Sequence, residues 1–112
     1  NHIGLFDRDT GDPAVLPALA EPHDPLLDVD PRARAYLDAN CAFCHRPDGP
    51  TPSSMDLGWD VAESAMGLPE GSERSELWER LERLDATRMP PLSSHVVDEA
   101  GVELIRRWIE TR

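Results

Sequence analysis

Both cysteines of the chain lie in one short string, with a histidine directly after the second: Cys41-Ala42-Phe43-Cys44-His45. Residues i and i+3 of a helical turn share a face, so the two thiols can form thioethers with the two vinyl groups of one haem. The imidazole of His45 then projects toward the iron from the same side. The string therefore predicts covalent haem attachment, with His45 as an iron ligand.

Other interpretations of the two cysteines fit the sequence less well. A zinc site needs a second pair of ligands, and the remaining histidines, His2, His23 and His95, are scattered along the chain. A thioredoxin-like dithiol belongs to a βαβ context, which this proline-rich and mainly helical sequence lacks. A free or disulfide-bonded pair is a further alternative, but it leaves His45 without a role.

A haem iron bound by one histidine has a sixth position, for which the sequence offers several side chains. Met89 is the first choice, because Pro90 and Pro91 stiffen the backbone that presents its thioether. Methionine ligation favours ferrous iron and raises the reduction potential. His95, six residues further along the same loop, is the main rival and would lower the potential. The other candidates are Met55, Met66, His2 and His23.

The elements expected to position these groups are helices, since no segment shows the alternation of a strand. Helices are predicted over residues 30–44, 60–66, 73–85 and 98–110. The predicted N-capping residues are Asp30, Ser72 and Asp98, and Pro31 follows the first of them. Proline-rich and glycine-rich stretches over residues 46–58 and 88–97 are expected to be loops. The predicted fold class is all-α.

Side-chain patterns assign faces to these helices. The third helix has an apolar face built from Leu77, Trp78, Leu81 and Leu84. Its i,i+4 pairs, Glu76–Arg80 and Glu79–Arg83, are placed on the solvated face. The core stripe expected on the last helix is Val102, Ile105 and Ile109.

Acidic residues and prolines concentrate at the start of the chain. The formal net charge is −11, and residues 1–30 contribute −6 of it through seven acids and one arginine. Four prolines between residues 13 and 25 disfavour helix there. Residues 1–29 are therefore predicted to form an acidic, irregular arm or linker, and residues 30–112 a haem domain.

Composition excludes several function classes. All 11 basic residues are arginine, and the only cluster is Arg106-Arg107, which disfavours a nucleic-acid partner. No apolar run approaches the ~20 residues that span a bilayer, and no signal peptide is present in these residues. A single domain of this size has a thin core, so a covalently linked haem is expected to supply buried apolar surface. The chain without haem is therefore expected to be largely unfolded.

Over residues 30–112 the sequence resembles a class I cytochrome c domain with one haem. The resemblance rests on the Cys41–His45 string closing a helix, on Met89-Pro90-Pro91, and on a C-terminal helix containing residues 104–109. The sequence of residues 36–47 resembles that of the cytochrome domains that bacteria append to larger secreted proteins. The resemblance implies that the first and last helices cross, with Ala33, Leu37 and Trp108 at the crossing.

The resemblance also implies contacts beyond the axial ligands. A backbone carbonyl from a proline-containing loop would orient the proximal imidazole, with Pro47, Pro50 and Pro52 as candidates. Trp59 and Arg88 are candidates for hydrogen bonds to the haem propionates, because an indole N–H and a guanidinium both donate to carboxylates. Relatives that dock on acidic partners use a ring of lysines, and this chain has no lysine.

The predicted function is electron transfer by one covalent c-type haem with His45 and Met89 as axial ligands, rather than catalysis. The expected partner is a redox protein or an adjacent catalytic domain of a longer chain. The alternative is a haem enzyme or gas-binding protein with an open sixth position, in which His95 and Arg88 would act on the distal side. The expected location is the periplasm or another extracytoplasmic compartment, where c-type haem is attached.

Overall fold

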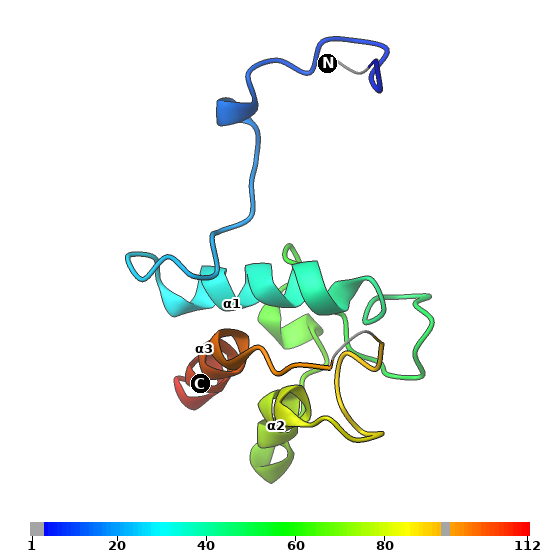
Figure 1. Ribbon diagram of the computed structural model, residues 1–112, viewed down its shortest axis with the longest axis vertical. Helices are drawn as coiled ribbons and strands as arrows, with labels where there is room; N and C mark the ends of the chain where they lie inside the picture. The colour runs from blue at the N-terminus through cyan, green and yellow to red at the C-terminus, as the bar shows by residue number, and fades with distance from the viewer. Residues whose placement is uncertain (1–3, 93–94) are drawn as a thin grey trace.

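The computed structural model describes residues 4–92 and 95–112, apart from the side chain of Ser72. This part of the chain contains three α-helices and no β-strand (Figure 1): α1 Val29–Leu37, α2 Glu76–Glu82 and α3 Glu99–Glu110. Short 3-10 turns lie at Pro13–Val15, Glu63–Ala65 and Gly71–Ser75. The predicted all-α class is therefore confirmed for the described residues. None of the helices found there is long and apolar enough to cross a bilayer.

The start of α1 differs from the prediction. The N-cap position is Asp28, which makes no side-chain capping bond, and Asp30 lies inside the first turn. The prediction that Asp30 caps this helix is therefore wrong. Pro31 is tolerated in this turn because the first four N–H groups of a helix have no intrahelical partner. The freed carboxylate of Asp30 accepts a hydrogen bond from the indole of Trp108 instead.

The far end of α1 continues as a π-helical turn over Asp38–Ala42. The helical path therefore ends close to Cys44, as predicted. The N–H groups of Cys44 and His45 both donate to the carbonyl oxygen of Cys41, at 3.0 and 2.9 Å. These two bonds hold the predicted haem-binding string in a compact turn at the end of the helix.

α1 packs closely against α3, through buried apolar side chains and a hydrogen bond between Tyr36 and Asp98. Ala33, Leu37 and Trp108 are buried there, as the sequence analysis expects of them. A Cβ added at Gly101 of α3 would overlap the ring of Tyr36, so glycine is needed where the two helices touch. The Tyr36 hydroxyl donates to Asp98 Oδ2 at 3.0 Å, which fixes the ring against α3.

α3 agrees closely with its prediction. The Asp98 side chain accepts from the Gly101 N–H at 3.0 Å, so the predicted N-cap is confirmed, and the helix ends at Glu110. Val102 and Ile105 are buried, and Ile109 packs against the core.

The middle helices are shorter than predicted. The segment expected over residues 60–66 keeps one 3-10 turn, and the helix expected over residues 73–85 starts as 3-10 and becomes α2. The cap predicted at Ser72 concerns a side chain outside the described ones. Arg83 is extended, with ψ of 147°, so Leu84 leaves the apolar face and is 56% exposed. Leu77, Trp78 and Leu81 pack against the core as expected.

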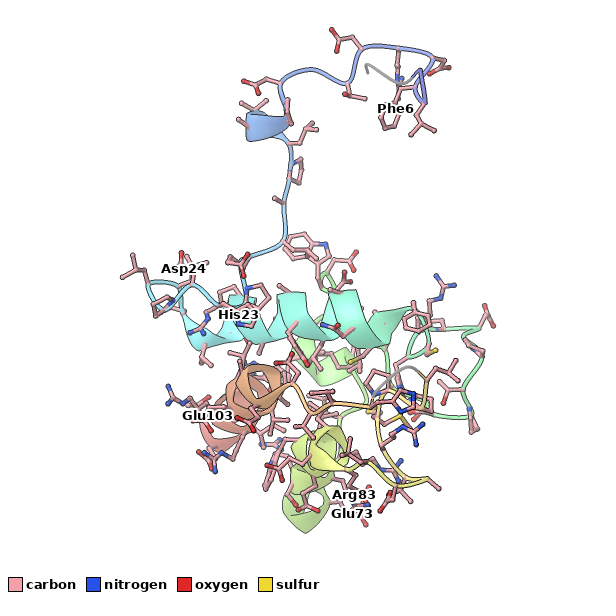
Figure 2. All side chains as sticks on the ribbon, in the orientation of Figure 1. Phe6, His23, Asp24, Glu73, Arg83 and Glu103 are labelled. Atoms are coloured by element: carbon pink, nitrogen blue, oxygen red, sulfur yellow. The ribbon has the colours of Figure 1, made fainter. Side chains whose placement is uncertain are left out.

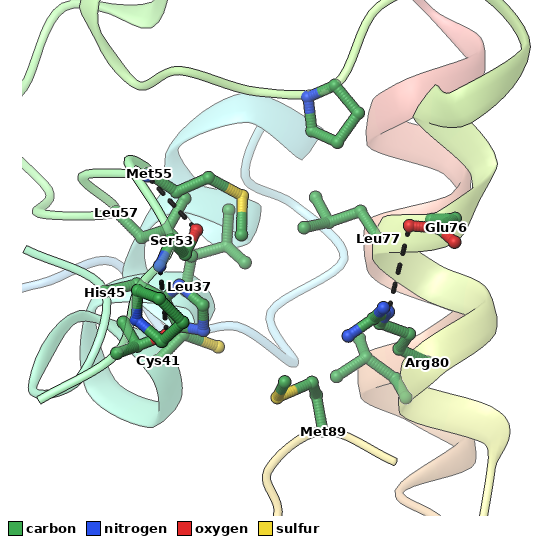
Figure 3. Close-up of a pocket in the computed structure, with 14 residues that line it drawn as sticks. Leu37, Cys41, His45, Ser53, Met55, Leu57, Glu76, Leu77, Arg80 and Met89 are labelled. Atoms are coloured by element: carbon green, nitrogen blue, oxygen red, sulfur yellow. Dashed lines mark hydrogen bonds and ion pairs between the residues drawn. The ribbon is translucent and has the colours of Figure 1, made fainter. Parts of the chain in front are cut away.

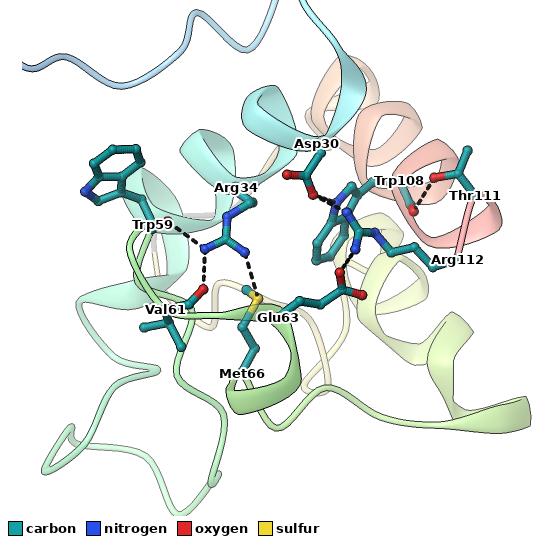
Figure 4. A network of polar contacts seen from close by, with 9 residues as sticks. All are labelled: Asp30, Arg34, Trp59, Val61, Glu63, Met66, Trp108, Thr111 and Arg112. Atoms are coloured by element: carbon teal, nitrogen blue, oxygen red, sulfur yellow. Dashed lines mark hydrogen bonds and ion pairs between the residues drawn. The ribbon is translucent and has the colours of Figure 1, made fainter.

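Two arginines tie the helices to the middle segment (Figure 4). Arg34 of α1 donates to the carbonyl oxygens of Trp59, at 2.6 Å, and Val61. Arg112 forms ion pairs with Asp30 and Glu63, and its guanidinium lies 4.4 Å from the centre of the Trp108 ring. These contacts join segments that are far apart in the sequence.

The described part of the arm, residues 4–28, extends away from the helical body (Figure 1). It contains no α-helix, in agreement with its proline content, and its apolar side chains, including Phe6 at the far end, are exposed (Figure 2). One hydrogen bond, from Arg32 Nε to the Pro22 carbonyl at 2.8 Å, holds its base to α1. Its role as a linker stays a prediction.

Candidate cofactor-binding site

A cavity of about 480 Å³ lies between the C-terminal end of α1 and the side of α2 (Figure 3). This volume falls within the roughly 300–1,000 Å³ that is usual for cofactor pockets. Cys41, His45 and Met89 all line the cavity, although they come from distant parts of the sequence. Most of the remaining wall is apolar, with contributions from Leu37, Leu57, Leu77 and Leu81.

One wall of the cavity is built by the turn after α1 and by the irregular segment of residues 51–57. The Leu57 N–H donates to the carbonyl oxygen of His45 at 2.9 Å, which holds residues 55–57 beside the histidine. The chain reverses sharply before it returns there. A Cβ at Gly49 would overlap the carbonyl oxygen of Cys44, so this reversal requires glycine.

The two cysteines are free thiols rather than a disulfide. Cys41 lines the cavity, and burial, with a smaller effect of the neighbouring Cys44, raises the pKa of its thiol to about 12. Cys44 is half-buried one turn further on. Within the described residues no cluster of three or more Cys, His, Asp or Glu side chains is arranged to hold a metal ion.

His45 is half-buried, and its surroundings disfavour the protonated imidazole. Burial lowers its pKa, and the positive charge of Arg80 lowers it further. The neutral ring offers a lone pair to a metal ion. Its Nδ1 atom is buried and has no hydrogen-bond partner, so the carbonyl contact that the resemblance implies for Pro47, Pro50 or Pro52 is not formed in this structure.

The opposite wall is formed by α2 and by Met89. The Met89 N–H donates to the carbonyl oxygen of Arg80 at 2.9 Å, which attaches the methionine to the α2 side of the cavity. The guanidinium of Arg88 donates to the carbonyl oxygens of Asp85 and Pro91 at 3.1 and 3.0 Å. Arg88 thus braces the loop that carries Met89. Figure 3 shows the Met89 side chain in the lining of the cavity.

The other candidates for a sixth ligand are placed less suitably. Met55 lines the cavity, but it belongs to the wall that carries His45. Met66 is fully buried in the core, where its sulfur lies 3.7 Å from a guanidinium nitrogen of Arg34. His23 and His95 are exposed and do not line the cavity, and His2 lies outside the described residues.

Trp59 and Arg88, the predicted propionate donors, do not line the cavity. Trp59 is 52% exposed, and its backbone N–H donates to Asp38 Oδ1 at 3.0 Å. Arg88 uses its guanidinium within its own loop. The structure therefore does not bring these two side chains together with Cys41, His45 and Met89, and their propionate roles stay predictions.

Sequence reasoning missed Arg80 and Glu76, which both line the cavity. Their i,i+4 pairing is present, with 3.8 Å between Arg80 Nε and Glu76 Oε2, but the pair does not lie on a purely solvated face. A signal existed in the sequence, because Arg80 follows Leu77 by three residues and so shares its side of the helix.

Comparison with known proteins returned no match among protein-family models, curated proteins or solved structures. The observations that bear on function are therefore the all-α fold and the side chains of this cavity.

Proposed function

We propose that this chain transfers single electrons with one c-type haem, bound covalently through Cys41 and Cys44. In this proposal His45 and Met89 are the axial ligands. The observation that carries the proposal is that these two side chains line one largely apolar cavity from different walls. Two residues that would hold one iron between them must come from different walls of the cavity, which favours Met89 over Met55.

The donor chemistry of the cavity fits a haem. Cys41 lines the cavity with a free thiol and Cys44 carries another three residues further on, and the imidazole of His45 and the thioether of Met89 line the same cavity. The unpartnered Nδ1 of His45 shows that the ring is not fully satisfied by the described protein groups. When bound, the haem supplies a one-electron Fe(II)/Fe(III) couple whose potential is raised by Met/His ligation.

The residues of this chain hold and shield the group. Cys41 and Cys44 fix it at two points, and the bond from Met89 N–H to the Arg80 carbonyl keeps the thioether on the far wall. Leu57, Leu77 and Leu81 give the cavity an apolar lining, and a low local polarity would tune the potential. We assign no substrate to the site.

The proposal places the protein outside the cytoplasm, in the periplasm of a bacterium. Its partner is then either a separate redox protein or a catalytic domain of the same longer chain. The acidic arm is consistent with a tether to such a domain, since it extends away from the cavity-bearing body.

The test is to express the chain with a c-type haem attachment system and to record its intact mass and absorbance. We expect a mass increase of one haem, lost in the Cys41→Ala, Cys44→Ala variant, and a low-spin oxidised spectrum with a methionine–iron charge-transfer band. Met89→Ala should abolish that band, and Met55→Ala, the matched control on the other wall, should keep it. A high-spin spectrum that changes with carbon monoxide after reduction would instead support the open-site alternative.

A further inference from the structure

Arg80 is the one positively charged side chain among the described residues that line the cavity. It lies on α2 and faces the cavity beside Met89 (Figure 3). The titratable and charged groups that line the cavity are Cys41, His45, Glu76 and Arg80. Any anion that enters this space therefore meets a single cation.

The hydrogen-bonding capacity of Arg80 is not fully used. Its Nε atom is buried and has no hydrogen-bond partner. Glu76, its ion-pair partner, keeps its Oε2 atom 3.8 Å from that nitrogen, which is too long for a hydrogen bond, and the Glu76 side chain is 52% exposed. The Arg80 side chain as a whole is 37% exposed, but its buried Nε donor lacks an acceptor, so the site favours an acceptor that approaches this atom more closely.

A second i,i+4 pair, formed by Glu79 of α2 and Arg83 directly after the helix, differs from Glu76–Arg80 in its position relative to the cavity. Arg83 and Glu79 form an i,i+4 pair at 3.6 Å, and the Arg83 side chain is 38% exposed against 37% for Arg80, but neither residue lines the cavity. Arg83 also donates to the Thr87 hydroxyl at 3.1 Å. Arg83 is thus a control for Arg80 in residue type and i,i+4 pairing, although it directly follows the last residue of α2.

We infer that Arg80 is the anion anchor of the cavity, and that Glu76 pairs with it only until a carboxylate of the cavity's occupant replaces that contact. A guanidinium binds a carboxylate through two parallel N–H donors, a geometry that the present pair does not reach. For the occupant proposed above, the carboxylate is a propionate of the haem, so the inference rests on the proposed function. The backbone of Arg80 holds Met89, and its side chain holds the acidic edge of the cofactor.

The experiment measures the reduction potential of the haem-loaded protein as a function of pH in Arg80→Gln, Arg80→Lys and Arg83→Gln. Removing a cation beside a carboxylate raises the pKa of that carboxylate by about 1–3 units. We expect Arg80→Gln to move the pH at which the potential changes upward by this amount. The substitution should also lower the potential itself, because the ferric state loses a nearby repulsive charge. Arg83→Gln should match the unmodified protein, and Arg80→Lys should show a smaller shift.

Two results would overturn the inference. One is a loaded Arg80→Gln protein, with a normal spectrum, whose inflection and potential equal those of the unmodified protein. The other is loss of the inflection in Glu76→Gln, because the titrating group would then be Glu76. Failure of the proposed function is seen separately, since an unmodified chain that carries no haem fails the mass measurement before any potential is recorded. If Arg80→Gln binds no haem, the potential of Arg80→Lys still tests the inference, because an unchanged inflection and potential in that variant would contradict it.

Discussion

The indole nitrogen of Trp108 donates a hydrogen bond to Oδ1 of Asp30 over 2.8 Å, and this bond joins α3 to the first turn of α1. Trp108 is fully buried, so its N–H has no access to water. Asp30 also pairs with Arg112, whose guanidinium covers the Trp108 ring. The carboxylate of Asp30, predicted to cap its own helix, thus links the start of α1 to the C-terminal end of α3.

Asp30→Ala should destabilise the protein, because it leaves the buried indole N–H without an acceptor. We expect a loss of about 1–3 kcal/mol in the free energy of unfolding, measured by urea titration. Asp28→Ala is the control, since Asp28 makes no side-chain capping bond, and its effect should stay within about 0.5 kcal/mol. Equal effects of the two substitutions would contradict the role given to Asp30.

Gly101→Ala should reverse the usual effect of alanine in a helix. Alanine is normally favoured over glycine in a helix interior by about 0.5–1 kcal/mol. Here the added methyl group would overlap the Tyr36 ring, so we expect a loss of about 1–3 kcal/mol from overpacking. Thermal unfolding checks this, with Ala100→Ser on the exposed side of α3 as control. A rise in the melting temperature of Gly101→Ala would refute the close packing.

Tyr36 should make the protein sensitive to alkali. Burial, and then the charge of Asp98, raise its pKa well above the ordinary value of 10.0, so the folded chain retains a proton that the unfolded chain releases. Stability from this group is therefore complete below pH 10 and falls as the pH rises above it. Unfolding titrations at pH 9 to 11 should show this slope, to which the raised pKa of the free Cys41 thiol adds in the chain without haem, and Tyr36→Phe should reduce it. A Tyr36→Phe protein with an unchanged slope would exclude Tyr36 as its source.

The protein without covalent haem should lose most of its helix. The cavity lies between α1 and α2, and without a bound group the leucines that line it lack packing partners on that side. Circular dichroism of Cys41→Ala, Cys44→Ala should show greatly reduced helicity compared with the haem-loaded chain. Near-normal helicity would mean that the fold is stable without the cofactor.

Deleting residues 1–28 should leave the haem spectrum unchanged. The described arm makes one hydrogen bond to α1, from Arg32 to Pro22, and none of its residues lines the cavity. Absorbance of the oxidised truncated protein checks this, with the full chain as the reference. Loss of the methionine–iron band in the truncated protein would show that the arm helps to hold the site.

Several features of this protein follow from local sequence. The Cys41–His45 string closes a helix, Asp98 caps α3, and the period of Val102 and Ile105 marks the buried face. These predictions succeed because capping, helical period and the spacing of a short motif depend on residues within a few positions of one another. The irregular arm is predictable for the same reason, since each proline restricts its own backbone.

Tertiary structure decides the rest. Only packing shows that Met89 lines a different wall from Met55, that Arg80 lines the cavity, and that Trp59 does not. The capping prediction at Asp30 failed because a partner 78 residues away, Trp108, uses its carboxylate. Such contacts depend on which distant segments pack together, and the same short sequence pattern is compatible with several different packing arrangements. The sequence by itself determined the chemistry available to this protein, and the fold selected the residues that face the cavity.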